Sequence, residues 1–298
     1  MSGERRGRGP SRRLRTPGAA REEVKYPAWA RPSTAPRLSR KVLAIAGFDP
    51  SGGAGIAADI KTITAYRLYG AAVITSVTAQ NTQGVQAIYD LPMEFIAQQI
   101  ESVVSDTDYQ AVKIGMLGTA RAVSIVASLI ESFGLPHVVV DPVFRSTTGA
   151  QLLEPKGIEV LRKELLPRAV VLTPNMEEAG TLAGMAVKDL ESMKVAARRI
   201  HGMGARNVVV TGGHLGNRAI DVLHDGERTA VFDSVKIASA NTHGIGCTFS
   251  TSIACMLARG MNVFEAVDQA KRFVSRAVNH SSRLGKGTGP LNHLVSPF

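Results

Sequence analysis

The chain has 298 residues, 44% of them hydrophobic, so it can bury one large α/β core or two small ones, and we expect one. Its net charge of +10 does not indicate a nucleic-acid-binding body, because residues 1–41 hold ten Arg and two Lys against three Glu, which leaves the remainder at +1. A membrane-spanning helix is not expected either, because no stretch approaches the roughly 18 consecutive apolar residues that it requires.

The first 40 residues form a basic extension with five prolines and neither a helical nor a strand period. We predict that residues 1–40 are disordered and that residues 41–298 form one domain. The extension lacks the apolar run of a secretory signal and the amphipathic, acid-poor pattern of a transit peptide. A basic arm for nucleic acid or another anionic surface is the alternative interpretation.

From Val42 onward, short apolar runs alternate with longer amphipathic segments. The runs are typical of buried parallel strands and cover residues 42–46, 72–77, 111–114, 138–141, 169–172 and 208–211. Helical patterns separate most of them, over residues 56–69, 94–105, 120–133, 155–165 and 190–203. This alternation predicts a parallel sheet covered by helices on both faces, which binds ligands beyond the carboxyl ends of its strands.

After the last of these strands, residues 219–223 and 229–236 alternate like a hairpin that turns at Asp225-Gly226. Two helices, over residues 246–259 and 263–284, then close the chain.

The two cysteines, Cys247 and Cys255, lie eight positions apart on one predicted helix, which separates them by about 12 Å along its axis. They are too far apart for a disulfide, and no His or Cys falls beside them at metal-ligand spacing. Free cysteines without a secretory signal are typical of a reducing compartment, so we expect a cytoplasmic protein.

A glycine-rich segment, Gly47-Phe-Asp-Pro-Ser-Gly-Gly-Ala-Gly55, follows the first strand and opens a helix. Its glycines let the backbone approach a ligand closely. The segment lacks both the G-x-G-x-x-G spacing of a dinucleotide fingerprint and the G-K-[ST] of a Walker loop. We interpret it as part of a binding site, and a purely structural tight turn is the alternative.

A second segment, Asn241-Thr-His-Gly-Ile-Gly-Cys-Thr248, lies at the start of a helix. Unpaired N–H groups and the positive end of the helix dipole converge there and predict a site for an anion. Cys247 adds a base whose pKa the helix terminus is expected to lower. A helix cap with a small buried thiol is the alternative.

A third segment, Thr173-Pro-Asn-Met-Glu-Glu178, follows the strand that ends at Leu172. Asn175 and Glu178 are three positions apart, so on a first helical turn they share a face. An amide and a carboxylate there can hold a hydrated Mg²⁺ beside the phosphates of a nucleotide. The same spacing is typical of helix capping, and the segment alone does not decide between the two functions.

Five further segments complete an ordered set: Gln80-Asn-Thr-Gln-Gly84, Lys113-Ile-Gly-Met-Leu117, Asp141-Pro-Val143, Gly212-Gly-His214 and Gly285-Lys-Gly-x-Gly-Pro290. With this set, the chain resembles the hydroxymethylpyrimidine/phosphomethylpyrimidine kinases of the ribokinase superfamily from about Val42 to about His293. The resemblance implies a ribokinase-like three-layer α/β/α sandwich with a mostly parallel central sheet, and a homodimer. It also implies ATP-dependent phosphorylation of 4-amino-5-hydroxymethyl-2-methylpyrimidine and then of its monophosphate, with Mg²⁺, in thiamine biosynthesis.

Carried over by position, the resemblance implies roles for individual residues. The small-molecule pyrimidine substrate would be bound by Gly47, Ala54, Asp59, Gln80, Met116 and Val143. Its ring edge would be read by the Gln80 amide. The nucleotide would be bound by Asn175, Thr211, Gly213 and His214, and the metal by Asp141 and Glu178. Catalysis would be carried by Gly244, Gly246 and Cys247, with the thiol taking the proton of the hydroxymethyl group.

The sequence departs from the pattern of this family at four places. Thr211 and Ala240 stand where relatives often have a lysine, and residues 144–149 replace a segment in which a Met and a Lys are common. These changes remove cationic phosphate contacts, so the second phosphorylation is less firmly implied than the first. Ile245 replaces a threonine between the two glycines, a mild change if that loop works through its N–H groups.

Two other functions stay open. A pyridoxal kinase would belong to the same superfamily, in which several relatives phosphorylate both rings. A non-catalytic pyrimidine-binding regulatory protein would be expected to carry a damaged phosphate loop, whereas Gly244, Gly246 and Cys247 are intact here.

Overall fold

The computed structural model describes residues 40–298, apart from the side chains of His214 and Leu215. The predicted basic extension, residues 1–40, lies outside the described residues except for Arg40. The strands are β1 (Lys41–Phe48), β2 (Tyr69–Asn81), β3 (Gly84–Asp90), β4 (Ala111–Ile114), β5 (Val138–Val140), β6 (Val171–Leu172), β7 (Val208–Leu215), β8 (Arg218–His224) and β9 (Thr229–Val235).

The helices alternate with these strands, as the apolar pattern predicts. They are α1 (Gly55–Ala65), α2 (Met93–Asp106), α3 (Ala120–Ser132), α4 (Pro155–Val160), α5 (Met176–Ala183), α6 (Leu190–His201), α7 (Ile245–Ala258) and α8 (Val263–Asn279). After α4 the chain continues as a π-helical turn, Leu161–Leu165, so the predicted helix 155–165 is helical over its whole length.

The described strands form one nine-stranded sheet in the order β3-β2-β1-β4-β5-β6-β7-β8-β9. The six central strands, β2-β1-β4-β5-β6-β7, pair in parallel. Strand β3 at one edge and strands β8 and β9 at the other pair antiparallel. The predicted mostly parallel sheet and the hairpin after β7 are therefore confirmed.

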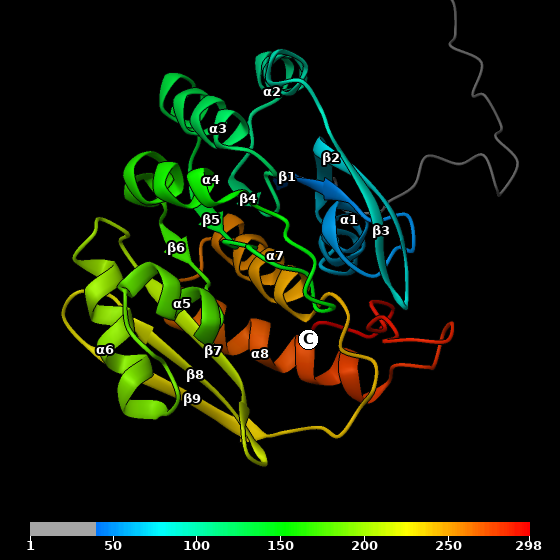
Figure 1. Ribbon diagram of the computed structural model, residues 1–298, viewed down its shortest axis with the longest axis vertical. Coiled ribbons are helices and arrows are strands. Elements are labelled where there is room, and N and C mark those ends of the chain that lie inside the picture. The colour runs from blue at the N-terminus through cyan, green and yellow to red at the C-terminus, as the bar shows by residue number, and fades with distance from the viewer. Residues whose placement is uncertain (1–39) are drawn as a thin grey trace, which may run out of the picture. The chain divides into compact units, whose positions relative to one another are not determined.

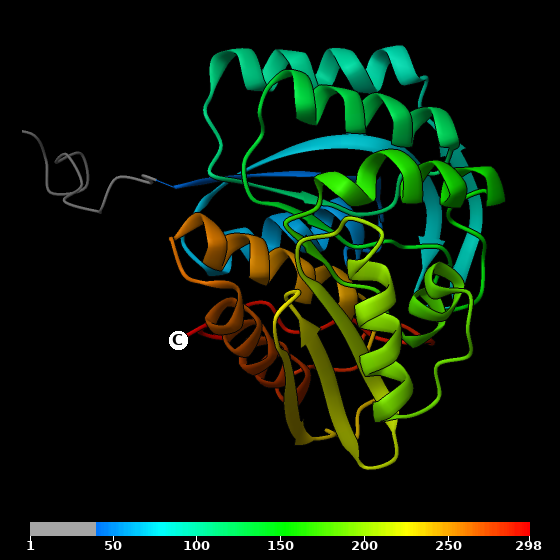
Figure 2. The ribbon, with the colours of Figure 1, turned by 90° about the vertical axis from the view of Figure 1, so that its left-hand side faces the viewer.

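Successive residues of the central strands face opposite sides, as the strand period requires. Val42 and Ala44 of β1 belong to a hydrophobic cluster that includes residues of α1, α7 and α8, whereas Leu43 and Ile45 belong to one that includes residues of α2, α3, α5 and α6. Figures 1 and 2 show these two sets of helices on opposite sides of the sheet. The resulting three-layer α/β/α sandwich confirms the predicted fold.

Several elements differ from the sequence-based expectation. The helix predicted over residues 56–69 ends at Ala65, and β2 already begins at Tyr69. Strand β3 was not expected, because its side chains are largely exposed at the sheet edge and show no apolar period. The last helix, α8, ends at Asn279 rather than near residue 284. Helix α5 was expected only as a first turn, and the left-handed Gly184 ends it after eight residues.

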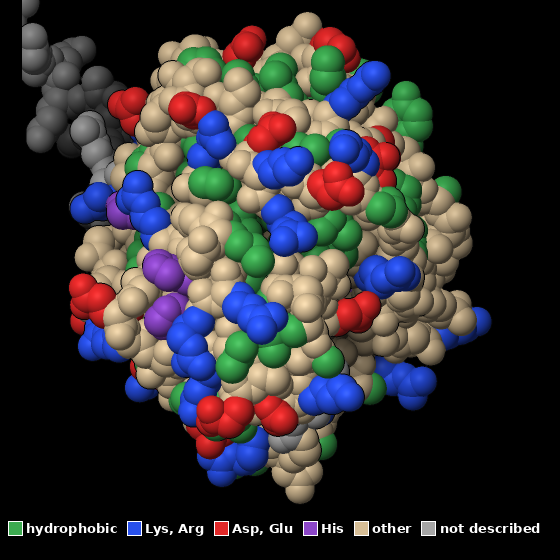
Figure 3. All heavy atoms as spheres, turned by 60° about the vertical axis from the view of Figure 1, so that its left-hand side comes forward, with side chains coloured by type: hydrophobic (Ala, Val, Ile, Leu, Met, Phe, Trp, Pro, Cys, Tyr) green, Lys and Arg blue, Asp and Glu red, His purple; other side chains and the backbone are tan. Residues whose placement is uncertain are grey.

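The surface of the body agrees with its near-neutral balance of charge. On the face in Figure 3, Lys and Arg side chains are interspersed with Asp and Glu side chains rather than gathered in one basic patch. Within residues 40–298, no helix is long and apolar enough to cross a membrane.

Candidate active site

The carboxyl ends of the parallel strands meet the N-terminus of α7, and the predicted segments gather at this edge. The glycine-rich segment follows β1, Gln80 lies at the end of β2, and the metal and nucleotide candidates follow β5, β6 and β7. This is where a doubly wound sheet binds ligands.

The glycine-rich loop, residues 47–55, is folded around the carboxylate of Asp49. The N–H groups of Ser51, Gly53 and Ala54 donate to that carboxylate at 2.8, 3.2 and 2.9 Å. Gly55 has a φ of +54°, and a Cβ there would lie 2.2 Å from the Gly47 oxygen. The loop therefore requires glycine at this position for steric reasons.

The second glycine segment, residues 241–247, forms the predicted N-terminus of α7. Gly244 caps the helix in the left-handed conformation, with a φ of +86°. Among the described residues, the N–H groups of Gly246 and Cys247 donate to no backbone or side-chain oxygen. They remain available at the positive end of the helix dipole, as an anion site requires.

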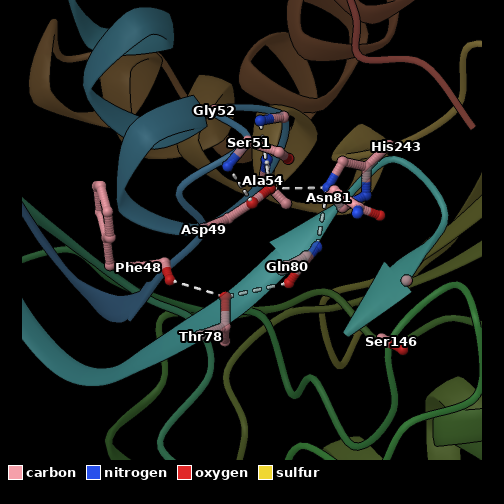
Figure 4. Close-up of polar contacts among 12 residues, drawn as sticks. Phe48, Asp49, Ser51, Gly52, Ala54, Thr78, Gln80, Asn81, Ser146 and His243 are labelled. Atoms are coloured by element: carbon pink, nitrogen blue, oxygen red, sulfur yellow. Dashed lines mark hydrogen bonds and ion pairs between the residues drawn. The ribbon is translucent and has the colours of Figure 1, made fainter. Parts of the chain in front are cut away.

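The two glycine loops interlock. A Cβ on Gly244 would lie 1.9 Å from the Gly53 oxygen, and a Cβ on Gly53 would lie 2.3 Å from Cδ2 of His243. His243 Nε2 lies 2.7 Å from Asp49 Oδ2 and 3.2 Å from the Gln80 side chain (Figure 4). Segments almost 200 residues apart in the sequence thus hold one another in place.

Cys247 lies on the first turn of α7, but its pKa is not lowered. Burial raises the pKa of the Cys247 thiol to about 12, although the charge of Lys113 and the N–H of Gly55 oppose the shift. The expected lowering of this pKa is wrong, because loss of water outweighs the helix terminus. The thiol is therefore protonated near neutral pH.

Asp59 does not face the open site. Its side chain and that of Lys113 are both fully buried, and their closest atoms are 2.9 Å apart. The Thr251 hydroxyl of α7 also donates to Asp59, at 2.6 Å. Burial alone would lower the pKa of Lys113, but the Asp59 carboxylate raises it, so Lys113 is charged. The structure corrects the expected direct contact of Asp59 with substrate, since both its oxygens are engaged in the core.

The two predicted metal ligands lie in the same electrostatic environment. Burial raises the pKa of Asp141 to about 6, against the opposing charge of Lys113. Burial and then the charge of Asp141 raise the pKa of Glu178 to about 8. The two carboxylates therefore repel each other in a poorly hydrated place, and a cation between them would relieve that repulsion.

The donor set suits Mg²⁺, which binds one or two carboxylates and keeps other positions for water and phosphate. The described residues contain no cluster of three or more His, Cys, Asp or Glu that could hold a metal ion by itself. Asp141 also lies against the second glycine segment, because a Cβ on Gly246 would be 3.7 Å from Asp141 Oδ2. A metal held there would face an anion bound at α7.

Asn175 and Glu178 form a capping box at the start of α5. Asn175 Oδ1 accepts from the Glu178 N–H, and Glu178 Oε2 accepts from the Asn175 N–H, both at 2.9 Å. Helix capping, one of the two functions weighed for this pair, is therefore present. Glu178 Oε1 also accepts from the Phe144 N–H at 3.4 Å, so the turn after β5 is tied to the same carboxylate.

The remaining nucleotide candidates lie at the end of β7. The Thr211 N–H donates to Pro174 at 2.9 Å, which holds the ends of β6 and β7 together. Gly213 is exposed, and a Cβ added to it would meet no atom within 4 Å, so a ligand can approach its backbone. His214 lies on β7, and its side chain is outside the described atoms.

The other predicted pocket residues lie at or just after the ends of β1, β2, β4 and β5. Met116 packs on Gly47, since a Cβ there would be 2.8 Å from its sulfur. Ala54 precedes α1, and Val143 is half-buried in the turn after β5. Gln80 is half-buried at the end of β2, where it borders a small cavity with Gly84, Ser146 and Thr148.

Sequence reasoning missed the contacts that join these loops. Asp49 and His243 stand inside recognised segments, but no short-range spacing connects them. The C-terminal segment is a second case: the N–H groups of Gly287 and Thr288 donate to Thr82 at 3.1 and 2.9 Å. The β2–β3 turn is thereby joined to the chain just before its C-terminus.

Comparison with known proteins agrees with this geometry. A family model described as phosphomethylpyrimidine kinase matches residues 49–292. The chain is 44% identical over 255 residues to the hydroxymethylpyrimidine/phosphomethylpyrimidine kinase of Rhizobium meliloti, covering 84% of this chain and 96% of that protein. It is also 44% identical over 263 residues to a thiamine biosynthesis bifunctional protein of Geobacter sulfurreducens, of which it spans 54%.

Solved structures show the same fold. An ADP complex of Bacillus subtilis pyridoxal kinase is 38% identical in sequence, with a TM-score of 0.80 over 85% of this chain and 97% of that one. The predicted fold family is confirmed.

Proposed function

The chain belongs to the phosphomethylpyrimidine kinase family, and we propose that it transfers the γ-phosphoryl group of ATP to 4-amino-5-hydroxymethyl-2-methylpyrimidine and then to its monophosphate. One observation carries this proposal. The N–H groups of Gly246 and Cys247 are free, and Gly246 lies against the carboxylate of Asp141, so an anion site and a cation site adjoin at the end of the sheet. Phosphoryl transfer needs both, because charge is spread over the transferred group.

Each part of the site has a task in this reaction. The α7 N–H groups would hold the transferred phosphoryl group, while Asp141 and Glu178 would hold Mg²⁺, which neutralises charge on the phosphates when bound. Asn175, Thr211, Gly213 and His214 would line the nucleotide side, and the β1 and β2 loops the pyrimidine side. Asp59 would act indirectly, by fixing the charge of Lys113 beneath α7.

The proton of the attacking hydroxyl group requires an acceptor, for which we retain Cys247. As the substrate oxygen bonds to the γ-phosphorus and the bond to the leaving ADP oxygen breaks, the thiolate would take the hydroxyl proton. A thiol with a pKa of about 12 supplies little thiolate at neutral pH, but that thiolate is a strong base. Most of the rate would then come from positioning and charge neutralisation.

A second substrate is favoured by a specific observation, the likeness to Bacillus subtilis pyridoxal kinase. An ADP-release assay with the hydroxymethylpyrimidine, its monophosphate and pyridoxal, with and without Mg²⁺, tests both functions. We expect turnover of the hydroxymethylpyrimidine to exceed that of pyridoxal. Binding of the pyrimidine without any ADP release would contradict the kinase and favour a regulatory binding protein.

A homodimer is proposed as the assembly. It is supported by large apolar side chains that are exposed near the β3 edge of the sheet, namely Val77, Ile88, Tyr89, Met93 and Phe95. Exposed apolar groups on neighbouring elements are typical of association surfaces. Sedimentation equilibrium tests this assembly, and Tyr89→Lys is expected to yield monomers. A wild-type monomer at micromolar concentration would contradict it.

A further inference from the structure

The amide of Gln80 lies between two polar partners at the rim of the pyrimidine side. One end of it is 3.3 Å from the Thr78 hydroxyl, which also donates to the Phe48 oxygen at 3.1 Å. The other end is 3.2 Å from His243 Nε2, which in turn lies 2.7 Å from Asp49 Oδ2. Figure 4 shows this chain of contacts from the glycine-rich loop that follows β1 across to β2.

The proton on His243 can be assigned from its neighbour Asp49. Burial alone would raise the pKa of Asp49, but hydrogen bonds from His243 and Ser51 lower it below its ordinary value. Asp49 is therefore a carboxylate, which only accepts hydrogen bonds. At 2.7 Å, His243 Nε2 must carry a hydrogen and donate it to Asp49.

This assignment decides how the Gln80 amide is oriented. A nitrogen that carries a hydrogen cannot accept from an amide NH₂, so the amide atom nearest His243 must be the oxygen, which shares the Nε2 hydrogen with the closer Asp49. The amide nitrogen then faces Thr78 and donates to its hydroxyl oxygen, which leaves the hydroxyl hydrogen for Phe48 alone. The opposite orientation, drawn in Figure 4, would point the amide hydrogens at the hydrogen of His243 Nε2. The two orientations occupy the same space, since amide oxygen and nitrogen differ little in size.

The imidazole that imposes this orientation has little room to move. A Cβ added to Gly53 would lie only 2.3 Å from Cδ2 of the ring, so the ring packs directly on Gly53. The neighbouring Gly244 also packs on Gly53, since a Cβ there would lie 1.9 Å from the Gly53 oxygen. The backbone N–H of His243 also donates to the backbone oxygen of Gly289 at 3.1 Å. Both the ring and its backbone are thus fixed before substrate binds.

We propose that Asp49 and His243 are positioning residues that fix the Gln80 amide in one orientation and so determine which ring the enzyme prefers. This inference rests on the proposed function. A fixed amide keeps one free N–H and one free oxygen lone pair side by side. An aminopyrimidine matches them with a ring nitrogen beside an amino group, whereas the pyridine nitrogen of pyridoxal is flanked by a methyl-bearing carbon and a C–H.

The test is His243→Phe, which keeps a ring against Gly53 and removes the N–H group. We expect the ratio of kcat/KM for the hydroxymethylpyrimidine to that for pyridoxal to fall roughly tenfold, the size of one lost hydrogen bond. The lower ratio is expected to come from a raised KM for the pyrimidine, with KM for ATP unchanged. Thr78→Val should lower the ratio less, because the Nε2 hydrogen of His243 still disfavours the amide nitrogen beside it. Gln86→Ala, an exposed amide on β3, is the matched control and should leave the ratio unchanged.

A second measurement does not depend on any variant being active. Long-range ¹⁵N–¹H spectra of histidine-labelled wild-type protein should show His243 with its hydrogen on Nε2. A hydrogen on Nδ1 alone would overturn the proposal, and so would an unchanged substrate ratio in a folded His243→Phe protein. If wild-type protein phosphorylated neither alcohol, the proposed function would fail, and the spectrum would still decide the orientation of the amide.

Discussion

The two sides of the candidate active site are held in different ways. On the nucleotide side, Asn175 and Glu178 satisfy each other within one helical turn. On the pyrimidine side, Asp49 depends on His243, which lies 194 positions away. A substitution on the first side should therefore disturb α5 and the adjoining turn after β5, whereas one on the second should disturb both glycine loops together.

The largest expected effect falls where the two sides meet, at Cys247. If the thiolate accepts the substrate proton, Cys247→Ala should lower kcat by about 10²–10⁴-fold while ATP binding stays nearly intact. Because burial raises the pKa of Cys247 to about 12, wild-type kcat should keep rising toward alkaline pH, and the difference from the variant should grow with it. Steady-state rates from pH 6 to 10 measure both. A variant within a few-fold of wild type at every pH would mean that the thiol only packs.

Gly244→Ala is the next largest change and tests whether the two glycine loops depend on each other. The new Cβ would lie 1.9 Å from the Gly53 oxygen at a φ of +86°, which adds a backbone clash to about 1–2 kcal/mol of conformational strain. We expect a lower melting temperature and raised KM values for both substrates. Gly246→Ala is the matched control, since its Cβ would meet only Asp141, at 3.7 Å. Equal effects of the two substitutions would contradict the interlock.

Glu178→Gln tests how the Glu178 carboxyl group on the nucleotide side affects the pH dependence of stability. Its folded-state pKa of about 8 lies above its ordinary value of 4.5, so the folded protein retains a proton that the unfolded chain releases. The resulting stability is complete below pH 4.5 and is lost as pH rises through about 8. The variant should therefore gain stability relative to wild type over that range, as measured by urea unfolding at a series of pH values.

The same variant should also show a weaker response to metal. Mg²⁺ with a non-hydrolysable ATP analogue should raise the melting temperature of wild type more than that of Glu178→Gln. Glu177→Gln, an exposed neighbour, serves as the control and should behave like wild type in both experiments. A Glu178→Gln protein with a normal Mg²⁺ requirement would remove Glu178 from the metal site.

The smallest effect is expected outside both sides. Deleting residues 1–39 should leave folding and turnover nearly unchanged, because this basic, proline-punctuated segment shows no periodic pattern. Thermal melting and ADP release compare the truncated and full-length chains. A large loss of activity would show that the extension has a catalytic role.

The sequence predicts the features that depend on short spacing. The buried strands, the helix that begins near Gly246 and the Asn-x-x-Glu capping pattern all follow from neighbouring residues. The partners of Asp49 and Asp59 do not, because their contacts with His243 and Lys113 depend on how the sheet brings distant strands together. The pKa of Cys247 was misjudged for a related reason: burial is a property of the fold, whereas a helix terminus can be recognised in the sequence.

The joining of early and late segments also bears on when a newly made chain becomes active. The β1 loop leaves the ribosome long before His243, and the β2–β3 turn leaves before Gly287, which donates to Thr82. Nascent chains build from the N-terminus, so the first half of the site remains incomplete for most of translation. A polypeptide released before Gly287 would lack backbone partners of both Thr82 and His243. Catalytic competence is therefore acquired only after residues 287–289 have been made, and ribosomes stalled earlier would hold inactive protein.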